Sequence, residues 1–382
     1  MKVDIVVVAA GSGSRFGQDK IFFELYGKPL VFYTLHNLFS SYHFEKKILV
    51  LNPRKISEGE KKLYPFFPDL VIVEGGNERT ISVLNGVRES VSDYVLIHDG
   101  ARPFVPSHVV ENVVKALRDW YAVTPAEPVR DTVKYHEGEF VIRTLDRSSL
   151  KSIQTPQGFR RDIIRSALED ALHEGLIYTD ETTLIEERGL KAKFVPGSPL
   201  NFKITYEEDV KMAERILSSN LRSGIGFDIH RFSKGRRMVL GGVDIPCEYG
   251  LAGHSDGDAL THAIIDALLG ASSLGDIGEL FPDSDERFRD IRSTILLERV
   301  VSLMEGRGFF PVNIDAVVIT ERPKILKYRD GIVKNLSRIL RIPENRVSVK
   351  GKTAEKMGFV GRKEGLAVIA NALVMEVKNA NG

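Results

Sequence analysis

The sequence is poor in cysteine, in net charge and in long apolar segments. Its 382 residues include one cysteine, Cys247, which excludes an intrachain disulfide framework and suits a reducing compartment. The formal net charge of +1 gives no reason to expect nucleic acid or an anionic membrane as a partner. No apolar run approaches the roughly 20 residues of a transmembrane helix. Lys2 precedes an apolar stretch, as in a signal peptide, but Asp4 interrupts this stretch and a glycine-rich turn follows where a signal peptide would be cleaved. We therefore expect a cytoplasmic protein.

The first part of the chain predicts a doubly wound α/β domain. A chain of 382 residues is too long for one typical domain. Short β-branched runs alternate with helix-like segments, which is the pattern of a mainly parallel, Rossmann-like sheet covered by helices. Strands are expected at 3–10, 47–52, 70–76, 93–103 and 120–128, and helices at 29–41, 79–90 and 107–119.

A second, smaller domain is predicted after a helix-like stretch at 207–224 with a polar tail. We expect the first domain to cover 1–219, a linker to cover 220–223 and the second domain to cover 224–382. Strand patterns alternate with helical stretches in this second part, which predicts an α+β sandwich. The expected strands are 224–232, 312–320, 347–351 and 365–377.

The glycine-rich turn "GSGSRFG", residues 11–17, predicts a phosphate site. Its glycine spacing misses the dinucleotide fingerprint by one position, and Asn52 stands where that fingerprint expects an acid. Two cations, Arg15 and Lys20, follow the turn. Backbone N–H groups of such a turn can hold a polyphosphate, and cations beside it can neutralise charge on a phosphorus under attack. An ordinary glycine turn with a solvated loop remains the alternative.

Six strings in the first domain carry a family resemblance. They are "AAGSGSR" (9–15), "GGNERTISVLNG" (75–86), "HDGARP" (98–103), "DRSSLKSIQTPQGF" (146–159), "YTDETT" (178–183) and "NFKIT" (201–205). In this order they resemble the 2-C-methyl-D-erythritol 4-phosphate cytidylyltransferase family of non-mevalonate isoprenoid synthesis. Hexose-phosphate nucleotidyltransferases share only the first string.

That resemblance implies roles for individual residues in joining CTP to 2-C-methyl-D-erythritol 4-phosphate. The triphosphate would be held by Ala10, Gly11, Gly13, Arg15 and Lys20, and the cytidine by Gly76, Asn77 and Ser82. Asp99 and Ala101 would lie near the ribose and a Mg²⁺ ion. The acceptor phosphate would be gripped by Arg147 and Lys203, aided by Arg102, Thr155 and Thr179. Arg15 and Lys20 would stabilise the pentacoordinate phosphorus. The loop before Lys20 is shorter than in the family, and Lys20 is the lysine that can fill that role.

The string "GHSDGDALTH", residues 253–262, points to a metal site in the second domain. Ser255, three residues before Asp258, predicts a capping-box-like helix start, with the helix running to Gly270. Asp228 and His230 are two apart on an expected strand, so their side chains point the same way. Together with His262 on the helix they make a nitrogen and oxygen donor set that leaves the fourth position of a zinc ion open. The alternative is a structural or solvated histidine.

Five strings between 224 and 377 resemble the 2-C-methyl-D-erythritol 2,4-cyclodiphosphate synthase family. They are "GFDIHRF" (226–232), "GLAGHSDGDALTHAIIDALLGA" (250–271), "LGDIGELFPDSD" (274–285), "ERPKI" (321–325) and "KTAEKMGFVGRKEG" (352–365). The resemblance implies that zinc is bound by Asp228, His230 and His262. His254 and Thr353 would stabilise the transition state, and Glu355 would hold Mg²⁺. Substrate contacts would come from Ser255, Asp276, Ile277, Gly278, Phe281, Asp283, Asp285, Lys324, Lys352, Phe359 and Arg362. Lys352 and Ala354 replace two of the three consecutive threonines common in the family.

The two resemblances together predict a bifunctional enzyme whose partners are CTP, 2-C-methyl-D-erythritol 4-phosphate and its cytidine diphosphate ester. The two reactions are not consecutive, because a kinase must act between them. The first family implies dimers and the second implies trimers, so we expect a homo-oligomer, up to a hexamer. Two other functions remain open from the residues alone: transfer to another sugar or polyol phosphate, and a nucleotide-sensing scaffold with a structural metal.

Overall fold

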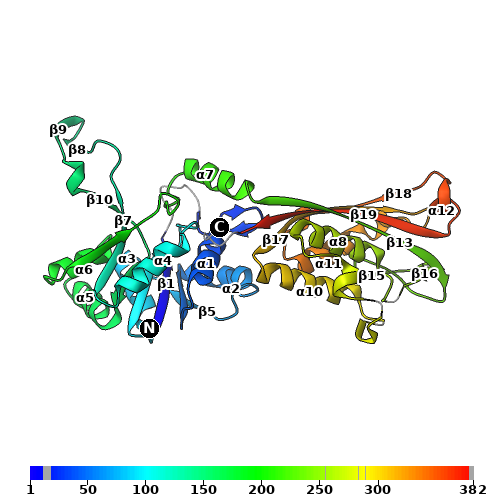
Figure 1. The fold of residues 1–382 in the computed structure, drawn as a ribbon, viewed down its shortest axis with the longest axis horizontal. Coiled ribbons are helices and arrows are strands. Elements are labelled where there is room, and N and C mark those ends of the chain that lie inside the picture. The colour runs from blue at the N-terminus through cyan, green and yellow to red at the C-terminus, as the bar shows by residue number, and fades with distance from the viewer. Residues whose placement is uncertain (12–18, 254, 283, 289, 378–382) are drawn as a thin grey trace. The chain divides into compact units, whose positions relative to one another are not determined.

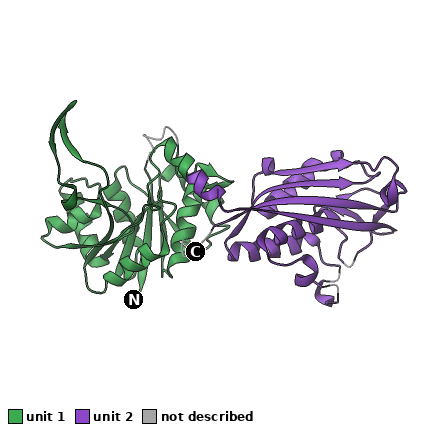
Figure 2. Ribbon diagram, turned by 45° about the horizontal axis from the view of Figure 1, so that its top comes forward, with its two compact units in different colours: residues 1–212, 379–382 green, residues 213–378 purple. Residues whose placement is uncertain are grey.

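The computed structural model describes residues 1–11, 19–253, 255–282, 284–288 and 290–377. Its backbone contacts divide it into unit 1, from Met1 to Met212, and unit 2, which begins at Ala213 (Figure 2). Helix α7, Glu207–Ser218, crosses this division, and strand β13, Leu221–Lys234, follows it. Residues 221–223 pair with residues 373–375 and therefore belong to a strand, not to the predicted linker. The predicted boundary at 219 remains a prediction.

Unit 1 contains an eight-stranded sheet with the order β10-β7-β11-β6-β1-β4-β5, and β12 pairs with β7. The central strands β6, β1, β4 and β5 are parallel. The sheet strands are β1 Val3–Ala9, β4 Lys47–Leu51, β5 Leu70–Glu74, β6 Tyr94–Asp99, β7 Ala122–Pro128, β10 Lys151–Ile153, β11 Gln157–Arg160 and β12 Ala192–Pro196. The predicted strands and helices of this domain are therefore confirmed to within a few residues.

Helices cover both faces of this sheet. Val6 and Val7, which point to opposite faces of β1, are both fully buried, as expected for a central strand of a doubly wound fold. Val6 belongs to a core formed with α3, α5 and α6, while α1 and α4 pack against each other. The helices are α1 Leu30–Ser41, α2 Ile56–Leu63, α3 Arg79–Glu89, α4 Ser107–Ala116, α5 Arg161–His173 and α6 Glu181–Glu187.

Two small hairpins complete unit 1. Strands β2, Glu24–Leu25, and β3, Lys28–Pro29, pair next to α1. Strands β8, Lys134–Glu137, and β9, Phe140–Thr144, form a hairpin that projects from the rest of unit 1 (Figure 1). All nine residues of β8 and β9 are exposed, among them the apolar Val141 and Ile142.

Unit 2 is built on a five-stranded sheet with the order β16-β13-β19-β17-β18, and helix α8 packs on β13 and β19. The approach of α8 to β13 is close, because a Cβ atom on Gly226 would lie 2.0 Å from the carbonyl oxygen of Ala263. The strands other than β13 are β14 Met238–Leu240, β15 Val243–Ile245, β16 Tyr249–Leu251, β17 Phe309–Ile319, β18 Val347–Lys352 and β19 Gly365–Glu376. The predicted α+β fold is confirmed.

Helices α8 Ala259–Ser272, α10 Ser293–Gly306 and α11 Arg329–Leu340 form one apolar core with the inner face of this sheet. Helix α9, Ile277–Leu280, packs against this core, and α12, Gly358–Gly361, contacts β19. Short 3-10 helices cover Pro53–Lys55, Arg147–Ser149, Glu286–Phe288, Ile325–Lys327 and Glu344–Arg346. In the described parts of the chain, no helix combines the length and the apolar character needed to cross a bilayer.

The start of α8 differs from its prediction. Asp258, not Ser255, is the N-cap residue, and its carboxylate accepts hydrogen bonds from the backbone N–H and the hydroxyl of Thr261 at 3.0 and 2.7 Å. The same carboxylate also accepts from the N–H groups of Gly241 and Gly242. A fully buried carboxylate needs such donors, and the loop at 241–242, distant in sequence, supplies two of them.

Candidate active sites

A cavity of about 500 Å³ lies beyond the carboxyl ends of the parallel strands of unit 1. The segments that follow β1, β4, β5 and β6 all contribute to its wall. Nine residues predicted for nucleotide and acceptor binding line it: Ala10, Gly11, Lys20, Gly76, Asn77, Ser82, Asp99, Ala101 and Lys203. Gly13 and Arg15 lie outside the described residues.

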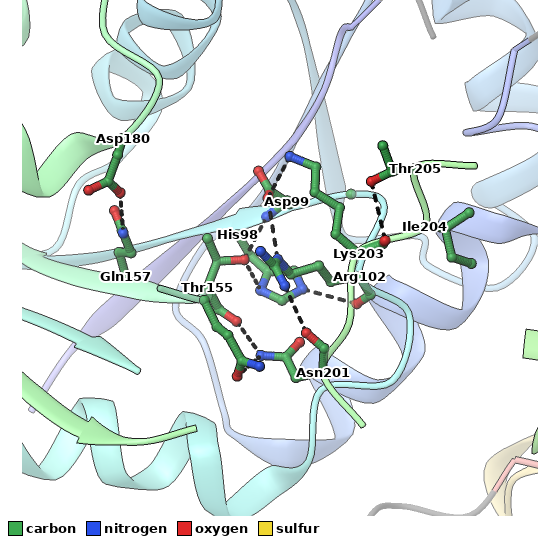
Figure 3. A network of polar contacts seen from close by, with 12 residues as sticks. His98, Asp99, Arg102, Thr155, Gln157, Asp180, Asn201, Lys203, Ile204 and Thr205 are labelled. Carbon is green, nitrogen blue, oxygen red and sulfur yellow. Dashed lines mark hydrogen bonds and ion pairs between the residues drawn. The ribbon is translucent and has the colours of Figure 1, made fainter. Parts of the chain in front are cut away.

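Asp99, at the end of β6, is surrounded by three cations. Its carboxylate oxygens lie 2.9 Å from Lys203 Nζ and 3.3 Å from Arg102 Nε (Figure 3). They also lie 3.3 Å from Arg79 Nη2. Burial alone would raise the pKa of Asp99, but these cations outweigh it and hold the pKa well below its usual range. The carboxylate is therefore ionised at every working pH, and it organises positive charge at the edge of the cavity.

A buried hydrogen-bond network of His98, Thr155 and Arg102 fixes the position of Asp99 (Figure 3). The Asp99 N–H donates to the hydroxyl of Thr155 at 3.1 Å, and that hydroxyl lies 3.0 Å from Nδ1 of His98. Nε2 of His98 lies 3.1 Å from the carbonyl oxygen of Arg102. Burial lowers the pKa of His98 to about 4, so the ring is neutral and donates to that carbonyl through Nε2. Thr155 and Arg102 thus hold Asp99 in place.

Lys20 and Ser82, which both line this cavity, are held by hydrogen bonds to the backbone. Lys20 Nζ donates to the carbonyl oxygen of Ile204 at 3.1 Å, which ties Lys20 to the segment that carries Lys203. The hydroxyl of Ser82 accepts from the N–H of Gly76 at 3.1 Å and donates to the carbonyl of Glu78 at 3.0 Å. The turn after β5 therefore keeps a fixed shape.

Four of the predicted residues of unit 1 are not among the described residues that line the cavity. Arg102 and Thr155 lie behind Asp99, and Thr179 is exposed, with its carbonyl accepting from Arg79 Nε at 3.4 Å. Arg147 is exposed after the β8–β9 hairpin, where its guanidinium donates to the carbonyl of Arg130 at 2.8 Å. Within one chain, the structure does not bring Arg147 to this cavity.

Sequence reasoning missed a buried ion pair in this region. Arg79 Nη2 lies 2.9 Å from Glu181 Oε2, and Glu181 is only 2% exposed. Burial raises the pKa of Glu181 to about 7, although the charge of Arg79 opposes that rise. Both residues lie inside strings that carry the family resemblance, so they were visible as motif members, but their contact across 102 positions has no local signature.

In unit 2, Asp228, His230 and His262 converge as the sequence predicts. One carboxylate oxygen of Asp228 lies 2.9 Å from Nε2 of His230 and 3.2 Å from Nδ1 of His262. The three donor atoms all lie within 4.8 Å of one another. Strand β13 supplies the first two residues and helix α8 supplies the third, so the tight β13–α8 packing at Gly226 sets the geometry.

The remaining ring nitrogens of both histidines are held by neighbours. Nδ1 of His230 meets the carbonyl oxygen of Ala252, and Nε2 of His262 lies 2.9 Å from the hydroxyl of Ser293. That hydroxyl in turn donates to Asp256, and Ser255 Oγ lies 3.1 Å from the same Nε2. Such partners fix the orientation of metal-binding imidazoles, so the donor set fits a resident metal ion.

Two separate cavities in unit 2 contain predicted substrate residues. One of about 400 Å³ is lined by the three metal-site residues with Ser255, Ile277, Gly278 and Phe281. The other, of about 470 Å³, includes Lys324, Lys352 and Thr353. Predicted residues outside the described linings are Asp276, which caps α9, Asp285, Glu355, Phe359 and Arg362. His254 and Asp283 lie outside the described residues. A single chain thus shows the two halves of the predicted site as two cavities with no described residue in common.

The two sites define a class of protein: a nucleotidyltransferase unit joined to a metal-binding unit for phosphate chemistry. Comparisons with known proteins specify it further. A family model described as 2-C-methyl-D-erythritol 4-phosphate cytidylyltransferase matches residues 3–219, and a YgbB family model matches residues 221–375. A "Bifunctional enzyme IspD/IspF" from Granulibacter bethesdensis is 37% identical, covering 98% of this chain and 99% of its own. One of the same name from Rhodospirillum rubrum is 39% identical, covering 98% of both.

A solved structure agrees with the fold of unit 1. The 4-diphosphocytidyl-2C-methyl-D-erythritol synthase from Anaerococcus prevotii is 30% identical with a TM-score of 0.51, covering 57% of this chain and 98% of its own. The chain belongs to the family of bifunctional IspD/IspF enzymes. It is a cytidylyltransferase and cyclodiphosphate synthase of non-mevalonate isoprenoid precursor synthesis, and the predicted identity and function are confirmed.

Proposed function

We propose that the cavity of unit 1 binds CTP and 2-C-methyl-D-erythritol 4-phosphate together. An oxygen of the acceptor phosphate attacks the α-phosphorus of CTP, the bond to the β-phosphate oxygen breaks, and pyrophosphate leaves. The observation that carries this proposal is the cluster of cations around Asp99, next to the backbone turns at Ala10 and Gly76. Two anions repel each other until cations screen them, so positioning is the main contribution of such a site.

Individual roles in unit 1 follow from place and charge. Lys20, with Arg15, stabilises the charge that develops on the phosphorus and on the leaving pyrophosphate. The cytidine is read by the backbone of Gly76 and Asn77, whose shape Ser82 holds. Lys203, fixed by Asp99 at 2.9 Å, binds the acceptor phosphate. Magnesium in unit 1 stays a prediction, because both carboxylate oxygens of Asp99 already meet cations.

In unit 2, we propose that the substrate's 2-phosphate attacks its own β-phosphorus, which closes the ring and expels CMP. Asp228, His230 and His262 would hold a zinc ion, which would supply Lewis-acid polarisation of a substrate phosphate oxygen. Thr353 and His254 stabilise the developing charge, and Lys324 and Lys352 bind the cytidine diphosphate. Glu355, exposed and hydrogen-bonded to the Thr353 hydroxyl, fits a Mg²⁺ ion held by one carboxylate and substrate phosphates.

We also propose that the active enzyme is a homo-oligomer. Arg147, next to the exposed β8–β9 hairpin, would complete the acceptor site of a second copy. The separation of the metal cavity from the Lys324–Thr353 cavity supports completion of the second site between copies as well. Dimer contacts through unit 1 and trimer contacts through unit 2 are satisfied together in a hexamer. The single exposed cysteine supports a cytoplasmic location.

Pyrophosphate release tests the proposal for unit 1. Purified protein given CTP, Mg²⁺ and 2-C-methyl-D-erythritol 4-phosphate should release pyrophosphate, and other sugar or polyol phosphates in its place should not support the reaction. Equal rates with an unrelated polyol phosphate would reject the acceptor. Addition of the 2-phosphorylated cytidine diphosphate ester to the same protein should release CMP.

A further inference from the structure

The proposed mechanism of cytidylyl transfer assigns no task to the ion pair of Arg79 and Glu181. Arg79 is the first residue of α3, and Glu181 is the first residue of α6. Nη2 of Arg79 lies 2.9 Å from Glu181 Oε2 and 3.3 Å from Asp99 Oδ1, while its Nε donates to the carbonyl of Thr179 at 3.4 Å. One guanidinium therefore joins three segments that are far apart in the sequence.

Stability alone does not account for this pair. Burial of two charges carries a desolvation cost, and the attraction between the charges often does no more than offset it. Apolar side chains of similar volume often stabilise the contact between two helices at least as well. The rise in the pKa of Glu181 to about 7, which burial causes, is a sign of that cost. A buried pair kept beside a substrate cavity at such a cost points to a role in function.

The contacts of Arg79 reach the acceptor side of the cavity. Asp99, which it touches, also holds Lys203, and the Thr179 carbonyl belongs to the segment that leads into α6. Arg79 itself lines the cavity. Its Nη1 is buried and has no hydrogen-bond partner among the described residues.

We propose that Arg79, held by Glu181, is a positioning residue for the acceptor in cytidylyl transfer. It sets the Thr179 segment and the Asp99–Lys203 pair relative to each other, so that the acceptor phosphate is aligned before CTP is attacked. This inference rests on the proposed function of unit 1. Arginine is needed because its planar fork meets several oxygens at once, whereas a lysine ammonium on a flexible stem cannot hold the same three partners in one geometry.

Steady-state kinetics of Arg79→Lys and Glu181→Gln test the pair. Arg79→Lys keeps the charge but loses the fork, so KM for the acceptor should rise about ten-fold or more, while KM for CTP changes less than about three-fold. Glu181→Gln keeps an oxygen acceptor for Arg79 and should show a smaller rise of the same kind. The double variant should be no worse than Arg79→Lys, because without the fork Glu181 has nothing to hold.

Arg88→Lys is the matched control. Arg88 also lies on α3, and its Nη2 meets Glu169 at 3.5 Å on the exposed surface, so this variant should keep both KM values. An acceptor KM within two-fold of wild type in both Arg79→Lys and Glu181→Gln overturns the proposal, as does an equal rise in the KM for CTP. If Arg79→Lys does not fold by circular dichroism, Glu181→Gln decides. Failure of wild-type protein to release pyrophosphate would instead reject the proposed function itself.

Discussion

Asp4 shows how a single buried charge can stabilise strand β1. Its carboxylate is fully buried and accepts hydrogen bonds from both the N–H and the hydroxyl of Ser92, from the Ser90 hydroxyl and from the N–H groups of Val91 and Lys46. Burial would raise the pKa of Asp4, but these donors outweigh it and the pKa is lowered. The residue that interrupts the apolar run in the sequence is thus a structural tie between β1 and the segments before β4 and β6.

Asp4→Asn should therefore destabilise unit 1 by about 3 kcal/mol at neutral pH, because an amide cannot accept from all these donors. A lowered pKa in the folded state adds stability above the unfolded value of about 4, and this stability is lost as the pH falls through the folded value. The gap between wild type and variant should therefore be widest above pH 5 and shrink at lower pH. Urea inactivation of cytidylyl transfer measures it, and a gap that does not change with pH would contradict the hydrogen-bonding account.

Lys20 is the residue whose role depends most on the short loop before it. If Lys20 stabilises the charge on the leaving pyrophosphate, Lys20→Ala should lower kcat on the order of a hundred-fold while KM for CTP changes little. Its hydrogen bond to the Ile204 carbonyl keeps Lys20 in the cavity wall. We therefore expect Lys20 to contact the phosphates of CTP in spite of the short loop. Near-normal turnover in the variant would show that the family role does not apply to Lys20.

At the scale of elements, the packing of β13 on α8 sets the metal site. Gly226→Ala would place a methyl group 2.0 Å from the Ala263 carbonyl oxygen, so the strand and the helix must separate. Because Asp228 and His230 lie on the strand and His262 on the helix, zinc affinity should fall about ten-fold or more, with a matching loss of cyclodiphosphate synthase activity. Zinc titration against a chelator measures this.

Gly270→Ala is the matched control, since a Cβ atom at Gly270 of α8 meets nothing within 4 Å among the described atoms. It should bind zinc as wild type does. Equal zinc affinity in Gly226→Ala and Gly270→Ala would show that the strand–helix spacing does not set the site.

The sequence predicts the elements well because their signals are local. A buried β-branched run such as 3–10 can be recognised within a few residues of sequence. The same holds for Asp228 and His230, which are two positions apart on one strand. The cap of α8 was predicted wrongly because Asp258 is stabilised by backbone N–H groups of residues 241–242, which no local pattern connects to it. The contact of Arg79 with Glu181 was missed for the same reason: only the folded chain brings α3 and α6 together.

At the scale of the whole molecule, each unit has its own core and its own site. Motif resemblance predicted which residues gather in each cavity, but it could not show that one chain leaves Arg147 away from the acceptor cavity or splits the second site in two. In the proposed oligomer these residues would meet between copies, and the sequence of one chain carries little direct information on such contacts. Light scattering that shows an active monomer would contradict the proposed oligomer.

The strongest test of two independent sites in one chain is the variant His262→Ala. Both reactions and the zinc content should be measured on the same purified variant, with Lys20→Ala as the reciprocal control. We expect His262→Ala to lose zinc and to slow CMP release about a hundred-fold or more, while pyrophosphate release from CTP stays within two-fold of wild type. Lys20→Ala should show the opposite pattern. Equal loss of both activities in folded His262→Ala protein would contradict the account.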